Sequence, residues 1–146
     1  MNTTVAIGTV LHHKGPQVWT ISPDATVFEA IRMLADKNVG ALLVVEEGKV
    51  MGMFSERDYT RKVALEGKTS QKTLVREIVS KDVVTVTPLN TVEDCMRLMT
   101  DKRIRHLPVL DNGKLVGLVS IGDMVNWIIS AQSATIDQME SYLTGR

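Results

Sequence analysis

Two segments of the chain place a hydroxyl and a carboxylate three residues apart. They are Ser55-Glu-Arg-Asp58 and Ser120-Ile-Gly-Asp123, and a glycine stands three residues before each serine. A serine between a strand and a helix lies beside unpaired backbone N–H groups, which favour an anion such as a phosphate. An ionised aspartate accepts hydrogen bonds and suits the two hydroxyls of a ribose. The two segments therefore predict sites for a sugar phosphate.

The same Ser-x-x-Asp spacing is also a capping pattern, in which both side chains only satisfy the backbone of the first helical turn. Taken alone, capping is the more common role. The recurrence of the pattern in both halves of the chain favours a double role for Asp58 and Asp123, as helix cap and as ribose ligand.

The two segments belong to an internal duplication. An offset of 65 residues aligns 19–63 with 84–128 without a gap, with identical residues at 14 of 45 positions. Duplicated units usually bury their apolar faces against each other. At 146 residues the chain has the length of a single domain, so we expect two copies in one domain.

Each copy predicts the order strand, helix, strand, strand, helix, which is an α/β fold. Capping patterns at Thr26–Glu29 and Thr91–Asp94 begin the first helices, and Glu47-Gly48 and Asn112-Gly113 form the hairpin turns. The strands are expected at 18–21, 41–46 and 50–54, and at 83–86, 107–110 and 115–119. A short helix is expected at 73–79.

The chain beyond Asp123 predicts an amphipathic helix, interrupted near Ser133. Its apolar residues are Val125, Ile128, Ile129, Ile136, Met139 and Leu143. This helix either packs over the core of its own domain, which we favour slightly, or forms a dimer contact.

Composition argues against several classes of partner. The 17 basic and 17 acidic residues balance, so no net field attracts nucleic acid or an anionic membrane. The longest apolar run, 41–45, is too short to span a bilayer, and the N-terminus lacks a secretory pattern. A single cysteine, Cys95, fits a reducing compartment. We expect a cytoplasmic protein.

These motifs together resemble tandem cystathionine β-synthase (CBS) domains, the pair called a Bateman module. In the first copy the resemblance lies in Thr20-Ile-Ser-Pro23, Val39–Val44, Gly48–Gly52 and Ser55–Asp58. The second copy has Thr85-Val-Thr-Pro88, Ile104–Val109, Gly113–Gly117 and Ser120–Asp123. The resemblance implies two β-α-β-β-α repeats related by pseudo-twofold symmetry in one CBS-pair domain, with residues 1–72 in the first repeat and 73–146 in the second.

The family resemblance implies two clefts between the repeats that bind AMP, ADP, ATP or NAD. It assigns the base to the segment before each first strand and to the start of each second strand. Here these are Lys14, Trp19, Val39, Gly40 and Ala41 with the first copy, and Ser80, Val84, Ile104, Arg105 and His106 with the second, where Pro108 follows in the strand. Arg57, Arg105 and His106 could contact phosphates. Core packing is an equal alternative for Val39 and Ile104, and Arg105 and His106 could be solvated.

We therefore predict a ligand sensor that signals occupancy to an unidentified protein and forms a homodimer. We expect the Asp58 cleft to prefer more phosphorylated ligands than the Asp123 cleft. The first copy has Arg57, Arg61 and Lys62 at the positions where the second copy has Gly122, Asn126 and Trp127. The alternative is a ligand-free interaction or dimerisation module.

Catalytic and metal sites are not expected. A nucleotide hydrolase at Arg57, Asp58 and Arg105 would need Asp58 as a base, and no residue is seen that would tune it. His12 and His13 lack nearby ligands with metal spacing. Cys95 falls on the buried helix face, so we expect it to be a core residue. We also expect no catalytic cofactor.

Overall fold

The computed structural model describes residues 3–15 and 17–144, which divide into two compact units. Residues 17–84 with 113–115 form the unit that contains Asp58, here called the Asp58 unit. Residues 1–16, 85–112 and 116–146 form the Asp123 unit. Each unit is described separately below.

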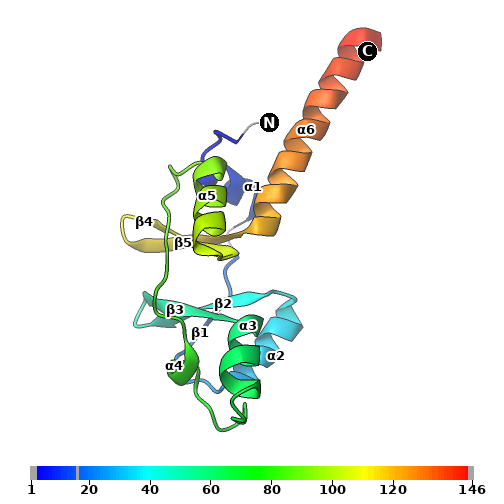
Figure 1. Cartoon of the computed structure of the whole chain (residues 1–146). Coiled ribbons are helices and arrows are strands. Elements are labelled where there is room, and N and C mark those ends of the chain that lie inside the picture. The colour runs from blue at the N-terminus through cyan, green and yellow to red at the C-terminus, as the bar shows by residue number, and fades with distance from the viewer. Residues whose placement is uncertain (1–2, 16, 145–146) are drawn as a thin grey trace. The chain divides into compact units, whose positions relative to one another are not determined.

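The Asp58 unit is built on a three-stranded sheet in the order β1-β2-β3. Strand β2 pairs in parallel with β1 and antiparallel with β3. Helices α2 and α3 lie side by side against this sheet (Figure 1). The elements are β1 (Thr20–Ile21), α2 (Val27–Lys37), β2 (Ala41–Glu46), β3 (Lys49–Ser55), α3 (Glu56–Tyr59), a π-helical continuation (Thr60–Ala64) and α4 (Val75–Ile78).

The core of the Asp58 unit lies between α2 and the sheet. Strand β2 is buried from Ala41 to Val44, and Leu42 and Val44 belong to the core cluster of this unit. The apolar stripe of α2 meets it through Val27, Ala30 and Leu34. The buried cluster consists of Ile21, Val27, Ala30, Leu34, Leu42, Val44, Phe54, Val63, Val75, Ile78 and Val79.

The Asp123 unit repeats this plan with a two-stranded sheet. Val86 forms an isolated parallel bridge to Val109, where the first copy pairs Ile21 with Val44. Helices α1 and α5 both contact α6, whose later turns extend past α5 in Figure 1. The elements are α1 (Ile7–Lys14), α5 (Val92–Lys102), β4 (His106–Asp111), β5 (Lys114–Ser120) and α6 (Ile121–Thr144).

The expected caps and turns are confirmed in both copies. Thr26 with Glu29, and Thr91 with Asp94, form complete capping boxes at the starts of α2 and α5. Both hairpins turn through a residue pair with positive φ, Glu47-Gly48 and Asn112-Gly113. These local signals require only neighbouring residues, which is why the sequence predicts them well.

Three expectations about the elements are wrong. Residues 83–86 form no strand, because only Val86 finds a partner. Residues 7–14 form a helix that no expectation included, and His12 and His13 lie in its last turn. Helix α6 continues without a break at Ser133, while the side chain of Ile136 lies outside the described ones.

The compact units divide the chain in another way than the repeats predicted at 1–72 and 73–146. The first N–H groups of α1 donate to the carbonyls of Asn90 and Pro88, at 2.7 and 2.9 Å. Those of α4 donate to the equivalent carbonyls of Ala25 and Pro23, at 2.9 and 2.8 Å. Helix N-termini need such acceptors. Each short helix finds them at a proline and at the residue two positions after that proline. Residues before β1 therefore belong with the second copy.

Candidate functional site

In the Asp58 unit, Ser55 and Asp58 form a reciprocal cap at the start of α3. The Ser55 N–H donates to Oδ2 of Asp58 at 2.9 Å, and the Asp58 N–H donates to the Ser55 hydroxyl at 3.3 Å. The Ser55 hydroxyl also donates to the same Oδ2 at 3.1 Å. The capping role expected for this spacing is thus confirmed. It occupies one of the two carboxylate oxygens.

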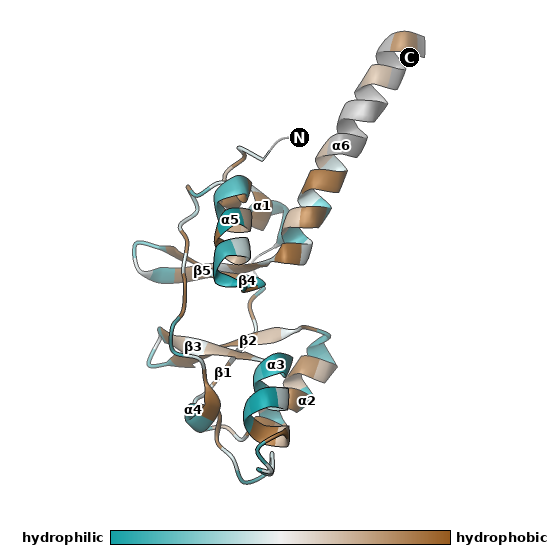
Figure 2. Ribbon diagram, in the orientation of Figure 1, coloured by the Kyte–Doolittle hydropathy of each residue, from teal (hydrophilic) through white to brown (hydrophobic). Residues whose placement is uncertain are grey.

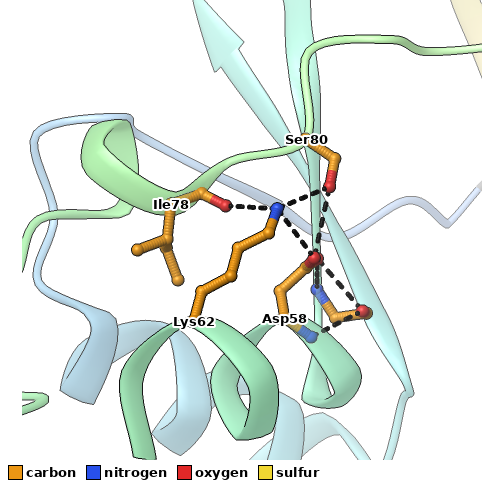
Figure 3. Close-up of polar contacts among 5 residues, drawn as sticks. Asp58, Lys62, Ile78 and Ser80 are labelled. Atoms are coloured by element: carbon orange, nitrogen blue, oxygen red, sulfur yellow. Dashed lines mark hydrogen bonds and ion pairs between the residues drawn. The ribbon is translucent and has the colours of Figure 1, made fainter. Parts of the chain in front are cut away.

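The other oxygen of Asp58 is occupied by residues from two further elements. Oδ1 accepts a hydrogen bond from the Ser80 hydroxyl at 3.2 Å and lies 3.3 Å from Nζ of Lys62. Lys62 also donates to Ser80 Oγ at 3.1 Å and to the Ile78 carbonyl at 3.2 Å. Figure 3 shows the ammonium of Lys62 between these three acceptors. The Asp58 side chain is only 14% exposed.

The segment after α4 reaches Asp58 because it runs beside β3. Met53 and Ser80 exchange both backbone hydrogen bonds, at 3.2 and 3.3 Å. Gly52 lies directly under this crossing and is buried. The glycine found three residues before the serine is therefore the point where two backbones meet.

In the Asp123 unit, Ser120 and Asp123 repeat the cap at the start of α6. The Ser120 N–H donates to Asp123 Oδ2 at 2.8 Å, and the Asp123 N–H donates to Ser120 Oγ at 3.1 Å. Lys14, at the end of α1, approaches the same Oδ2 at 2.7 Å and donates to the Leu118 carbonyl at 2.6 Å. No described residue donates a hydrogen bond to Oδ1 of Asp123.

Charged and aromatic groups surround this second carboxylate. Burial lowers the pKa of His106, the positive charges of Lys14 and Arg105 lower it further, and Asp123 opposes them. The rings of His13 and Trp127 lie 5.2 Å apart, and the indole Nε1 is buried without a hydrogen-bond partner among the described residues. Hence His106 favours its neutral form beside an Asp123–Lys14 ion pair.

Two predicted site residues each contact the aspartate of the copy with which they were not grouped. Lys14 was expected with Trp19 and Ala41, but it contacts Asp123. Ser80 was expected with the second copy, but it contacts Asp58. The reason is the backbone pairing of α1 and α4 described above, which anchors each preceding segment to a particular copy.

Other predicted residues of the first copy lie near the ends of its strands. Ala41 is buried and pairs with Ser55 across β2 and β3, whereas Gly40 and Arg57 are exposed and Val39 is half-buried. Trp19 packs against the core, and Nζ of Lys37 stands 4.3 Å over its ring. Lys37 therefore occupies one face of this ring, which was predicted to stack on a base.

The predicted residues of the second copy divide between backbone and surface. Pro108 is buried, and its carbonyl accepts from Val86 at 3.0 Å. Arg105 exposes its side chain while its carbonyl accepts from Ile121 at 2.9 Å. Ile104 and Val84 are half-buried. Only His106 is linked to the Asp123–Lys14 pair, through its charge interactions.

Sequence reasoning named Lys62 only as a basic residue of the Asp58 cleft and missed its contacts with Asp58 and Ser80. Its position four residues after Asp58 on one helical segment was the available signal, because residues at that spacing share a face. The described part of the chain contains no group of three or more metal-binding side chains. None of its helices is long and apolar enough to cross a membrane.

A family comparison decides the relationship of the two copies. The model of the CBS domain matches residues 13–65 and again residues 75–130. The chain belongs to the CBS domain family. It contains a tandem CBS pair, and the resemblance inferred from the motifs is confirmed together with the mixed helix and strand fold.

Relatives of this CBS pair include mitochondrial CBSX3 of Arabidopsis thaliana, which is 38% identical over 90% of this chain and 66% of its own length. A solved CBS-domain protein from Burkholderia ambifaria, described as a candidate signal-transduction protein, is 43% identical with a TM-score of 0.85. That match covers 88% of this chain and 96% of the other. The chain therefore spans about two thirds of the Arabidopsis relative and nearly all of the bacterial one.

A more distant CBS pair shares the fold. The protein MJ0100, solved with 5′-methylthioadenosine and S-adenosylmethionine, is 22% identical with a TM-score of 0.77, covering 88% of this chain and 98% of that one. The likeness extends to the arrangement of helices and strands in the pair.

Proposed function

We propose that this CBS pair is a regulatory module that binds adenosine-containing ligands, namely AMP, ADP, ATP or NAD, and signals their presence to a protein partner. One site includes Asp58 and Ser80, and the other includes Asp123 and Lys14. The proposal includes a cytoplasmic location and a homodimeric state. MJ0100, which shares the fold, was solved with two adenosine-containing ligands.

The observation that carries this proposal is the repetition of one polar cluster in two units. In each unit an aspartate at the third position of a helix accepts a hydrogen bond from the N–H of the capping serine. The same aspartate also contacts a lysine ammonium. A helix cap needs the serine and the aspartate only. The added ammonium brings a charge that suits phosphate beside a carboxylate that suits ribose.

The same contacts favour binding over catalysis. Asp58 accepts hydrogen bonds from Ser55 and Ser80 and lies beside the ammonium of Lys62. Both carboxylate oxygens are therefore occupied by groups of the protein itself. A carboxylate held in this way is a poor general base for hydrolysis.

Thermal unfolding with each nucleotide tests the proposal. A ligand present at 100 times its Kd should stabilise the protein by ~2.7 kcal/mol, which raises Tm by about 5–10 °C in a domain of this size. Asp58→Asn and Asp123→Asn should each remove part of the shift. Asparagine keeps one carbonyl oxygen for the cap, so the unliganded Tm reports whether the fold survives.

No shift with any adenosine compound would overturn this proposal. An exposed aspartate outside both clusters, Asp111, supplies the matched control. If Asp111→Asn removes the shift as completely as Asp58→Asn does, the ligand binds elsewhere on the protein.

A second function is favoured by the exposed apolar face of α6. Val125, Ile129, Met139 and Leu143 are 43, 54, 60 and 79% exposed. Ile129, Met139 and Leu143 lie 4, 14 and 18 residues after Val125. These offsets are close to whole helical turns, so the four side chains share one face. Figure 2 shows hydrophobic residues recurring along this helix. We propose that this face joins two copies of the chain.

Sedimentation of the wild type and of Ile129→Glu tests the association. A charge at the centre of an apolar contact should convert the dimer to monomer at micromolar concentration. Asn126→Glu, at an exposed position of the same helix outside the four apolar residues, should leave the dimer intact. A monomeric wild type would overturn this proposal without affecting the ligand sites.

A further inference from the structure

The two carboxylates of the CBS pair differ in how completely the protein occupies them. Asp58 has partners on both oxygens, with Ser55 on Oδ2 and with Ser80 and Lys62 on Oδ1. Asp123 concentrates its contacts with Ser120 and Lys14 on Oδ2. Its Oδ1 accepts no hydrogen bond from the part of the chain that the structure describes.

The difference arises from where each lysine comes from. Lys62 lies one turn after Asp58, and the equivalent residue of the second copy is Trp127, whose indole packs on His13. In the Asp123 unit the ammonium instead arrives from α1 and is also held by the Leu118 carbonyl. Lys62 thus contacts Oδ1 of Asp58, whereas Lys14 contacts Oδ2 of Asp123.

We propose that Lys62 determines the specificity of the Asp58 site by competing with the ligand's ribose hydroxyls for Oδ1 of Asp58. This inference rests on the proposed function. A pair of hydroxyls can reach both oxygens of Asp58 only if Lys62 and Ser80 withdraw from Oδ1. At Asp123 the corresponding oxygen accepts no hydrogen bond from the described residues, so a neutral nucleoside binds there more tightly.

The displaced ammonium also selects for phosphate. Once Lys62 leaves Asp58, it has lost its only anionic partner among the described residues and keeps neutral acceptors such as the Ile78 carbonyl. A ligand phosphate supplies a new anionic acceptor, whereas adenosine does not. The Asp58 site should therefore discriminate AMP from adenosine more strongly than the Asp123 site, where Lys14 keeps its ion pair with Oδ2.

Calorimetric titration of the full chain, with one site disabled at a time, tests this inference. In an Asp123→Asn background, Lys62→Met should tighten adenosine binding at the Asp58 site by about fivefold, the equivalent of ~1 kcal/mol for a partly exposed ion pair. Lys62→Arg keeps the charge and should keep adenosine binding weak. The ratio of AMP to adenosine affinity should fall in Lys62→Met.

The matched control is Lys14→Met in an Asp58→Asn background. Adenosine binding at the Asp123 site should not tighten there, because Lys14 leaves Oδ1 open. Unchanged adenosine affinity in Lys62→Met, with binding still measurable at both sites, would overturn the role of Lys62 alone. Failure of adenosine and AMP to bind any variant would overturn the proposed function, and the role of Lys62 with it.

Discussion

Gly52 lies against the backbone of Ser80, and a Cβ atom at Gly52 would stand 2.5 Å from the Ser80 carbonyl oxygen. Because the obstacle is backbone, it cannot rotate away. Gly52→Ala should destabilise the protein by ~1–3 kcal/mol, the usual cost of overpacking, and should loosen the segment that brings Ser80 to Asp58. Urea unfolding measures the loss.

Two other glycines of the chain calibrate this prediction. A Cβ at Gly117, the equivalent of Gly52, would meet only the end of the Leu11 side chain, at 2.6 Å. This side chain can shift, so Gly117→Ala should cost less. Gly122→Ala introduces only an ordinary contact at 3.6 Å and should stabilise α6 by up to about 1 kcal/mol. Equal losses at all three positions would contradict the backbone explanation.

His106 should make the protein less stable in mild acid. Burial lowers its pKa in the folded state, so the unfolded chain binds more protons as pH falls below about 6.5. The contribution of neutral His106 to the free energy of unfolding is fully present above that pH. It decreases below that pH by at most about 1.4 kcal/mol per pH unit, the limit for one group. His106→Gln should flatten this dependence between pH 7.5 and 5.5 in urea unfolding.

Cys95 should be inert in the folded protein. Its side chain is fully buried and burial raises the pKa of the thiol to about 12, with a smaller contribution from Asp94. The reactive thiolate is therefore scarce as well as inaccessible. A thiol-specific chromogenic reagent at pH 8 should react completely in denaturant and only at the unfolding rate in buffer. Rapid labelling of native protein would show that α5 opens locally.

The two copies use different residues at the same left-handed positions. Asn38 and Arg103 end α2 and α5 with φ of 53° and 54°, and Glu47 and Asn112 begin the hairpin turns at 52° and 50°. Asparagine tolerates this conformation better than glutamate or arginine. Glu47→Asn and Arg103→Asn should each stabilise the protein by about 0.5 kcal/mol, part of the cost of a left-handed residue.

The reciprocal substitutions provide the control. Asn38→Arg and Asn112→Glu should destabilise by similar amounts, and all four are measured by the midpoint of thermal unfolding. Stabilisation by both members of a pair would show that side-chain contacts at the turn outweigh backbone conformation.

Sequence patterns predicted the parts of the fold whose causes are local. The capping boxes at Thr26 and Thr91 and the hairpin turns depend on neighbouring residues, and the repeat confirmed each of them a second time. The buried stripe through Val27, Ala30 and Leu34 follows from helical period alone.

The parts that depend on distant partners could not be predicted in this way. Helix α1 is short, carries no side-chain cap and is completed by the carbonyls of Pro88 and Asn90, far along the chain. The contact of Lys14 with Asp123 depends on that pairing, and the contact of Ser80 with Asp58 depends on the corresponding pairing of α4. The spacing of apolar residues shows which face of a helix is apolar. It does not show which copy packs against that face.

The pairing of α1 with residues of the second copy sets an order of events during synthesis. Residues 17–84 hold nearly all of the Asp58 unit and can leave the ribosome and fold while the rest is still being translated. Helix α1 is translated before this unit, yet its acceptors at Pro88 and Asn90 and its ion-pair partner Asp123 are translated after it. A helix made before the Asp58 unit therefore completes its contacts only after that unit has been made.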